Sequence, residues 1–463
     1  MNADPLEEQG RIRRLLAGGP LSAVQLMAGA GISQSTLSRT IRRMTDAVTP
    51  FRVSGDRTPR YGLLRQLPLG VAPRQNIFRV LRTGAFAPFA HVEFFAGGAT
   101  LERIGSRATL YEGLPPYMTF AAPSGFLGRH LAQEAAQHLA FPASLKDWGD
   151  EHRVAYLFTR GLNLPGNLVF GDIPLQAEID LRVAEPTPAD RKGAYFLQSA
   201  TALRDASFGS SAGGEQPKFL GLMEDSGHVI VKFAKSGSRM AELLPLEHLA
   251  LRSLAEVGVP AARTQLLAAG DYVFLEVQRF DRIGKSGRVG MLSAGAVDDE
   301  FFGLRDTWSQ FAARCEAAGY LSSVDARHVD TVAAFSELIG NTDRHFENIS
   351  LLIDESGEYA GIAPAYDILP MRYASIGGGV DPELLPVEPK VGAIGAKPDV
   401  WARSMAAAER FWSAAQANDL SVPVSAQMKQ LAAQNLAVAR RFVEPLLPVV
   451  SSALSEKRRG KLG

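Results

Sequence analysis

The chain has 463 residues, of which 46% are hydrophobic and 21% charged, and its 49 basic side chains balance 49 acidic ones. This length predicts two or three domains with large cores. The net charge of zero excludes an overall electrostatic attraction to nucleic acid or membrane, so any such site must be a local patch. The single Cys315 excludes a disulfide framework and a cysteine-based zinc site, and we expect it to be buried in a helix. The polar N-terminus has no apolar signal core and no apolar run could span a bilayer, which favours a cytoplasmic protein.

The N-terminal segment predicts three short helices. Residues 6–17 form an amphipathic pattern that a Gly-Gly-Pro stretch ends. Ser22 and Ser33 are suitable N-caps for two further helices, the second over residues 34–44, with a glycine turn between them. The apolar residues of that last helix fall at helical spacing: Leu37, Ile41 and Met44. A glycine turn between two helices, the second rich in polar and arginine side chains, is typical of a helix-turn-helix that enters the major groove.

A DNA-binding domain is therefore expected over residues 1–68. Residues 48–64 alternate around a Gly-Asp turn and predict a β-hairpin wing, and residues 1–65 hold ten Arg and no Lys against five Asp plus Glu. Arginine is well suited to phosphate contacts. The candidate DNA-binding residues are Gln34, Ser35, Thr36, Arg39, Arg42 and Arg43. The alternative is a small module of the same shape that packs against protein.

A middle region, residues 74–185, is expected to be structural. It mixes three β-like runs, over residues 76–83, 90–97 and 108–115, with one helix-like stretch near 126–140. No metal-ligand spacing and no nucleophile–base arrangement stands out in its sequence. Its scattered histidines are expected to be surface or packing residues: His91, His130, His138 and His152.

The third region, residues 190–450, has four features in the order that a protein kinase needs. The first is the glycine-rich segment 210–219, which we take as a loop between strands whose backbone N–H groups could approach phosphates. Taken alone, an ordinary hairpin turn explains it better. The second is Lys232 in an apolar strand, where kinases hold the α- and β-phosphates with a lysine paired to a helix glutamate.

The partner of Lys232 is expected to be Glu247, at the start of a helix over residues 247–258, with Glu242 as the competitor. This pair would be a structural ion pair. The alternative is an edge-strand lysine that faces solvent.

The third feature is the spacing of Asp343 and Asn348, which is that of the kinase catalytic loop. A helical run ends at Gly340 and a strand begins at Ile349, so a short polar loop is fixed at both ends. Such a loop can present a carboxylate to an acceptor hydroxyl and an amide oxygen to magnesium. The fourth feature is Asp367, which follows the next hairpin at the place of the metal-binding kinase aspartate.

Four residues are therefore the predicted catalytic set: Lys232, Asp343, Asn348 and Asp367. Asn348 and Asp367 are the predicted magnesium ligands, and ATP and Mg²⁺ are the expected cofactors.

These segments, together with the stretches 114–132 and 277–282, resemble the HipA family of bacterial serine/threonine kinase toxins over about residues 75–450. Within that family the chain is most similar to the YjjJ-type homologues with a fused winged-helix domain. The resemblance implies an α+β, bilobal kinase-like fold with a mostly helical C-terminal lobe, and Asp343 as catalytic base. The residues that it assigns to ATP binding are Ser211, Ala212, Gly213, Gly214, Lys218, Lys232, Val277, Gln278, Arg279, Phe280, His345 and Tyr366.

The resemblance also implies regulation and partners. Family members autophosphorylate a serine of the phosphate loop, and either Ser211 or Ser210 could be that residue here. The family's substrates include aminoacyl-tRNA synthetases, so a protein of translation is a possible target, although no residue of this sequence identifies it. A separate DNA-binding antitoxin restrains the two-gene members, whereas here the fused domain could supply DNA binding itself.

Two alternatives stay open. One is a transcription regulator whose kinase fold only senses nucleotide, which the presence of all four catalytic candidates disfavours. The other is a small-molecule or lipid kinase, because the loop around Asp343 is similar to that of phosphoinositide kinases. Beyond the site, residues 401–419 and 425–447 predict two helices, in which Trp401, Phe411 and Trp412 are expected to lie in the core.

Overall fold

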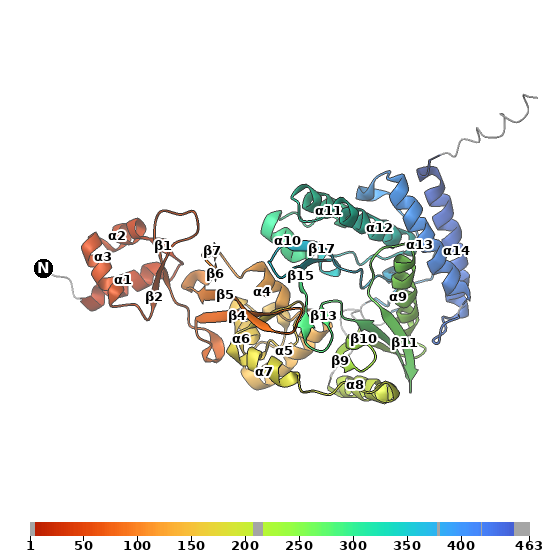
Figure 1. Cartoon of the computed structure of the whole chain (residues 1–463), viewed down its shortest axis with the longest axis horizontal. Coiled ribbons are helices and arrows are strands. Elements are labelled where there is room, and N and C mark those ends of the chain that lie inside the picture. The colour runs from red at the N-terminus through yellow and green to blue at the C-terminus, as the bar shows by residue number, and fades with distance from the viewer. Residues whose placement is uncertain (1–4, 207–215, 377–379, 418, 449–463) are drawn as a thin grey trace, which may run out of the picture.

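The computed structural model describes residues 5–206, 216–376, 380–417 and 419–448, and the fold is α+β (Figure 1). Three parts follow one another along the long axis of the molecule: a small N-terminal domain, a middle domain around a five-stranded sheet, and the kinase-like region. Within the described ranges no helix is both long and apolar enough to cross a bilayer.

The N-terminal domain contains the predicted helices and hairpin. Its elements are α1 (Pro5–Leu16), β1 (Leu21–Ser22), α2 (Ala23–Ala30), α3 (Gln34–Arg42), β2 (Val48–Phe51) and β3 (Arg60–Leu63). Ser22 caps α2 in a capping box with Gln25, and Ser33 caps α3 by accepting from the Thr36 backbone N–H. The left-handed Gly31, at φ 66°, makes the turn between the two helices. The core of this domain is apolar: Ile12, Leu16, Leu26, Leu37, Ile41, Met44 and Val48 are all buried.

The middle domain is built on an antiparallel sheet in the order β7-β6-β5-β4-β8. The strands are β4 (Arg74–Val80), β5 (Phe86–Phe94), β6 (Thr100–Ile104), β7 (Arg107–Tyr111) and β8 (Leu168–Phe170). The helices are α4 (Pro116–Ala121), α5 (Gly125–Leu139), α6 (Asp150–Arg160) and α7 (Asp172–Leu181). The expectation of a single helix was therefore incomplete. Five consecutive residues of α6, 154–158, are buried, and such a run lacks the helical period from which the sequence was interpreted.

The first lobe of the kinase-like region has a four-stranded sheet in the order β11-β12-β10-β9. Its elements are α8 (Lys192–Ala206), β9 (Lys218–Met223), β10 (Gly227–Lys235), α9 (Arg239–Glu256), β11 (Thr264–Ala269) and β12 (Tyr272–Gln278). Two expectations are corrected here. The glycine-rich segment follows the helix α8 rather than a strand, and Glu247 lies in the middle of α9 rather than at its start.

The second lobe is mostly helical. Its strands are β13 (Arg282–Ile283), β14 (Gly287–Arg288), β15 (Gly290–Ser293), β16 (Ser350–Ile353) and β17 (Tyr359–Ile362). Its helices are α10 (Ala294–Phe301), α11 (Trp308–Ala317), α12 (Ser323–Ile339), α13 (Pro398–Ala417) and α14 (Ala426–Val443). Cys315 is fully buried in α11, and the predicted core residues Trp401, Phe411 and Trp412 are fully buried in α13.

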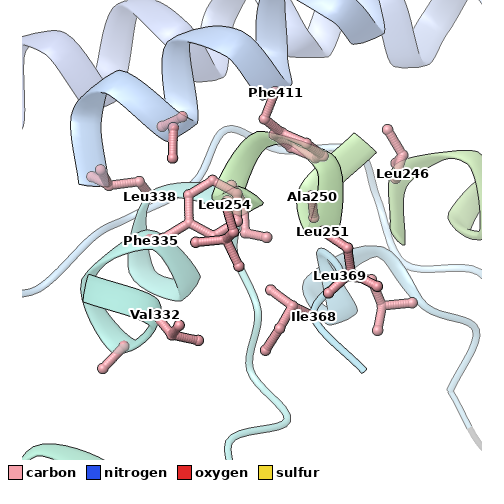
Figure 2. Close-up of a cluster of buried hydrophobic side chains, with 14 of the residues drawn as sticks. Leu246, Ala250, Leu251, Leu254, Val332, Phe335, Leu338, Ile368, Leu369 and Phe411 are labelled. Carbon is pink, nitrogen blue, oxygen red and sulfur yellow. The ribbon is translucent and has the colours of Figure 1, made fainter. Parts of the chain in front are cut away.

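One apolar cluster joins the segments that carry the candidate site (Figure 2). In it Leu246, Ala250, Leu251 and Leu254 of α9 meet Val332, Phe335 and Leu338 of α12, Phe411 of α13, and Ile368 and Leu369. Glu247 is on the first of these helices, the catalytic-loop candidates follow the second, and Asp367 directly precedes Ile368. Burial of large apolar side chains, worth roughly 1.5–3 kcal/mol each, therefore fixes the positions from which the polar residues project.

Candidate active site

Lys232 is the centre of a buried ion cluster. The side chains of Val231 and Phe233 pack on the α8 side of the sheet, so Lys232 projects from the opposite face by strand alternation. It is 5% exposed, and its Nζ lies 2.6 and 2.8 Å from the two carboxylate oxygens of Glu247. The same Nζ contacts Oδ1 of Asp367. Three segments far apart in the sequence therefore meet at one ammonium group.

The electrostatics of Lys232 reflect its burial. Removal from water lowers the pKa of Lys232 to about 8, while the carboxylate of Glu247 opposes this shift. Lys218, the residue paired with Lys232 across β9 and β10, adds to the lowering. Glu242, the alternative partner, contacts Arg239 at 2.8 Å instead. Lys218 and Lys232 therefore lie next to each other where β9 begins, at the end of the glycine-rich segment.

The loop after α12 is held in shape by its own polar groups. The helix ends at Gly340, which has a left-handed φ of 76°. Asn341 Oδ1 accepts from the backbone N–H of Asp343 at 3.1 Å, and Asn348 Nδ2 donates to the backbone carbonyl of Asp343 at 2.9 Å. The carboxylate of Asp343 makes neither bond, and its side chain is 45% exposed. The loop thus presents that carboxylate to solvent from a fixed backbone.

A chain of charged groups continues from Asp343 along the loop. His345 lies 3.5 Å from Asp343 through Nε2 and 3.3 Å from Glu347 through Nδ1. Arg305 contacts Glu347 at 2.6 Å. The hydrogen bond from His345, together with Arg305, lowers the pKa of Glu347 to about 2. Trp308 fixes the backbone beneath these groups by donating from its indole nitrogen to the His345 carbonyl at 3.1 Å.

Asp367 has a strained backbone, with φ at 55° in the left-handed region. It is held there on both sides. Ile368 is fully buried after it, and before it Tyr366 donates to the Glu347 carbonyl at 2.8 Å and lies 2.7 Å from Ser350 Oγ. The Tyr366 ring lies 5.6 Å from that of Phe280. Tyr366 therefore ties together the Asp367 segment, the catalytic-loop candidate and the segment after β12.

The segment 277–280 offers fewer side chains for contact with a nucleotide than expected. Val277 is buried in the core, and Gln278 donates to the Ser226 carbonyl at 3.0 Å. Arg279 turns toward the middle domain, where its guanidinium donates to the carbonyls of Asn163 and Leu164. Contact with an adenine through this segment would therefore use backbone groups and the Phe280 ring.

Two oxygen donors suit a magnesium ion. Asn348 uses its amide nitrogen for the loop, which leaves Oδ1 for a cation, and Asp367 offers a carboxylate that is 30% exposed. Mg²⁺ characteristically takes one or two protein oxygens and completes its octahedron with water and substrate phosphates. In the described part of the chain no group of three or more His, Cys, Asp or Glu side chains could enclose a metal. The two oxygens of Asn348 and Asp367 fit a magnesium ion whose other ligands are water and phosphate oxygens.

Comparison with known proteins settles the family. Residues 71–179 match the family described as the middle domain of YjjJ-like toxins, and residues 210–440 match the HipA-like C-terminal domain. The toxin YjjJ of Escherichia coli strain K12 is 32% identical over 410 residues, which is 86% of this chain and 90% of that protein. The chain belongs to the HipA/YjjJ toxin family.

Solved structures support the same fold. HipA of Shewanella oneidensis MR-1, in a complex with HipB and its operator DNA, matches with a TM-score of 0.52 and 16% identity, covering 80% of this chain and 99% of that one. At this identity the likeness shows the fold alone, and it is the kinase-like HipA fold. CtkA, a proinflammatory kinase of Helicobacter pylori, matches with a TM-score of 0.36 and 12% identity over 50% of this chain and 92% of its own, which is too low to add to the assignment.

The remaining candidates of this HipA/YjjJ chain fall into two groups. The phosphate-loop residues Ser210, Ser211, Ala212, Gly213 and Gly214 lie outside the described residues. The DNA-binding candidates lie on and just after α3: Gln34, Ser35, Arg39, Arg42 and Arg43 are exposed, and Thr36 is half-buried.

Sequence reasoning missed three residues around the catalytic-loop candidate: Arg305, Glu347 and Trp308. Arg305 has a left-handed φ of 42°, and the buried Asp298 holds its backbone N–H at 2.8 Å. Glu347 could have been suspected as a second acid within the polar loop. Nothing in the sequence connects Glu347 to Arg305, because the two residues lie 42 positions apart.

Proposed function

We propose that the chain is an ATP-dependent kinase that phosphorylates a serine or threonine of a protein, as a toxin of the HipA type. The observation that carries this proposal is Lys232, buried between Glu247 and Asp367 on the strand face opposite α8. A buried ammonium with carboxylates on two sides is suited to hold phosphate oxygens when a nucleotide enters. Membership in the HipA/YjjJ family supports the same activity.

Each residue has a role in this proposal. Asp343 accepts the proton of the acceptor hydroxyl while the hydroxyl oxygen attacks the γ-phosphorus. The bond between the γ-phosphorus and the β–γ bridging oxygen then breaks, and ADP is released. Lys232 holds the phosphates, and Glu247 orients Lys232. Asn348 and Asp367 hold magnesium, which neutralises charge on the phosphates when it is bound. His345 lies between the carboxylates of Asp343 and Glu347 and contacts both.

Transfer of label from γ-labelled ATP with Mg²⁺ tests the proposal. Wild type should label itself on Ser210 or Ser211, and Asp343→Ala should lower the rate by about 10²–10⁴-fold. Asp147→Ala removes an exposed acid of the middle domain and should label like wild type. Equal labelling of wild type and Asp343→Ala, or no labelling of either, would contradict kinase activity. A Ser210→Ala/Ser211→Ala double variant then decides whether the loop is the acceptor.

We further propose that the N-terminal domain binds DNA and tethers the kinase near its own gene. Glu8, buried in α1, accepts a hydrogen bond from Thr40 Oγ1 at 3.1 Å and so fixes α3 against α1. The capped end of α3 and five of the six DNA-binding candidates are exposed. The full chain should retard a fragment of the DNA upstream of its gene at modest salt, and Arg39→Ala should weaken that binding. Failure of wild type to retard any such fragment would exclude the tether.

The transcription regulator that only senses nucleotide is the second candidate. It shares the DNA-binding domain, so DNA retardation does not separate the two. A protein that binds ATP and DNA but transfers no phosphate under the labelling conditions would favour this second candidate. In that case there would be no protein substrate. If the chain does transfer phosphate, translation proteins such as aminoacyl-tRNA synthetases are the first substrates to test.

A further inference from the structure

A cavity lies between the middle domain and the kinase-like region, and none of the described candidate active-site residues lines it. Its volume is about 200 Å³, several times the roughly 30 Å³ that one water molecule occupies. Its walls come from the end of α7, from β9 and the start of β10, from Tyr195 of α8, and from the β13–β14 hairpin. The cationic and imidazole side chains on its walls are Arg182, His228, Arg282, Lys285 and Arg288. We call these residues with Glu178 the interdomain basic pocket.

The pocket is separate from the nucleotide site. Gly221 and Tyr195 line it, and a Cβ at Gly221 would lie 3.5 Å from the Tyr195 ring. The α8 helix that carries Tyr195 covers the sheet face onto which Val231 and Phe233 project. Lys232 projects from the other face. Leu220, Leu222 and His228 also line the pocket and lie on the Lys232 face, so the pocket reaches around the edge strand β9.

Positive charge exceeds negative charge around the cavity. Among the described residues Glu178 is the only acid in the wall, and it pairs with Arg288. Arg282 pairs with Asp281 at 2.7 Å, but the same carboxylate also serves Arg279 at 2.8 Å. Arg279, Arg282 and Arg288 thus share two carboxylates, which leaves no carboxylate for the other two cations of the wall among the described residues. Within the described ranges no acid pairs with Lys285 or Arg182, and the Arg182 guanidinium lies 4.0 Å from the centre of the Phe86 ring instead.

Two of these guanidinium groups also have unused donors. Arg282 Nε and Arg288 Nη1 have no hydrogen-bond partner in the described part of the chain, and the two residues are buried, at 9% and 6% exposed. A buried N–H without an acceptor costs roughly 1–3 kcal/mol, and more when it belongs to a charged group. Guanidinium groups are matched in shape and charge to phosphate oxygens. The pocket therefore offers unbalanced positive charge to an oxyanion, and two buried donors without an acceptor lie in its wall residues.

We propose that the interdomain basic pocket binds the phosphate or diphosphate group of a small organic ligand. Space for the rest of such a ligand is adjacent: a larger cavity between α5, α6 and α7, of about 520 Å³, shares Asn163, Leu181 and Leu220 with the pocket. The walls of that second cavity are mainly apolar, with Leu127, Leu131 and Leu139 among them. The ligand contacts the middle domain through Arg182 and the kinase-like region through Lys285 and Arg288, and so binds the two parts together.

Pyrophosphate binding to the full chain tests this site by titration calorimetry at fixed ionic strength, without magnesium. Arg182→Ala/Lys285→Ala removes two cations that are not deeply buried, so the fold should survive, and pyrophosphate affinity should fall about tenfold or more. A Lys146→Ala/Arg191→Ala double variant removes two exposed cations outside the pocket and should bind like wild type. Lys232→Met removes the nucleotide-site ammonium and should leave the same affinity.

The results separate cleanly. Loss of affinity in Arg182→Ala/Lys285→Ala alone supports the site. Unchanged affinity in that variant, loss only in Lys232→Met, or equal loss in both double variants each overturns it. Because Lys232→Met is measured with pyrophosphate rather than by labelling, the outcome does not depend on whether the chain proves to be a kinase.

Discussion

At the scale of single residues, the ion cluster around Lys232 combines a strong attraction with a costly burial. The ammonium contacts Glu247 and Asp367, and its removal from water is what lowers its pKa to about 8. Removing one partner of a buried pair leaves an uncompensated charge, at a cost of roughly 3–5 kcal/mol. The cluster is therefore suited to a partner exchange, in which phosphate oxygens take over the contact of Asp367 while Glu247 keeps the lysine in place.

Nucleotide affinity should therefore decrease at high pH. Lys232 carries its charge below a pKa of about 8 and loses it above, so the ammonium that attracts phosphate is present in neutral solution and absent in alkaline solution. We expect the affinity for a non-hydrolysable ATP analogue with Mg²⁺ to be nearly constant up to pH 8. Above that it should fall by up to about tenfold per pH unit. Fluorescence titration between pH 6.5 and 9.5 measures it.

Lys232→Arg is the matched control, because a guanidinium keeps its charge across this range. Its affinity is expected to be lower than that of wild type but flat with pH. A wild-type profile as flat as that of Lys232→Arg would show that the charge of Lys232 does not govern binding.

Some of these residues could be predicted from sequence and others could not. Asp343 and Asn348 lie within one loop of fixed ends, so their spacing in the sequence was enough to predict that they lie close together. Arg279 was taken as part of the adenine segment, but its guanidinium contacts Asn163, which is 116 positions away. A local pattern cannot indicate a partner at that separation. The same holds for the contact between Arg305 and Glu347.

At the scale of elements, start signals predicted helices well where they were local. Ser22 and Ser33 identified the N-termini of α2 and α3, because capping depends on residues three positions apart. The start of α9 was placed too late because Pro245 disfavours a helix interior. Burial of nearly the whole stretch 243–251 overcomes that local cost, and Ser238 supplies the actual N-cap. Tertiary packing therefore decided this boundary.

The cap of α3 gives a test at this scale. Ser33 Oγ accepts from the Thr36 N–H at 3.3 Å, so Ser33→Ala should destabilise the N-terminal turn of α3 by about 1 kcal/mol. Amide exchange in α3 of the full chain should then be about fivefold faster. Ser38→Ala is the control, because it removes an exposed hydroxyl from the interior of the same helix, where alanine is favoured. If both variants exchanged alike, the cap would have no measurable role.

At the scale of the whole molecule, the middle domain and the kinase-like region are joined by a buried polar network rather than by apolar packing alone. Asp281 is 4% exposed and accepts from Arg279, from Arg282 and from the backbone N–H of Gly166 at 2.8 Å. The two arginines extend the network to the Leu164 carbonyl. Because Asp281 lies three residues after the end of β12, the link between the domains begins next to the segment expected to meet adenine.

The N-terminal domain is attached differently. The Phe51 ring stacks on that of Phe95 at 5.2 Å, and Arg74 donates to Thr49 Oγ1 at 3.0 Å. Gly97 lies so close to the backbone of Gly18 that a Cβ there would approach it to 2.5 Å. This attachment places the DNA-binding candidates at the far end of the molecule from the kinase-like region (Figure 1). DNA binding and phosphoryl transfer could therefore proceed on one molecule without steric conflict.

Asp281→Asn tests the network as the link between the middle domain and the kinase-like region. The arginines keep the pKa of Asp281 below its usual value, so the carboxylate is charged in neutral solution. Loss of this carboxylate leaves the buried guanidinium groups with Glu178 as their one counter-charge among the described residues. We expect a loss of roughly 3–5 kcal/mol in stability, seen in calorimetry as a lower melting temperature or a separate early transition of the middle domain. Glu409→Gln is the control: it removes an exposed carboxylate from its contact with Arg440, at 2.9 Å, and should change stability by less than about 1 kcal/mol. Equal, small effects of the two variants would mean that apolar contacts alone hold the domains together. A large effect confined to Asp281→Asn would place the link in the network around Asp281.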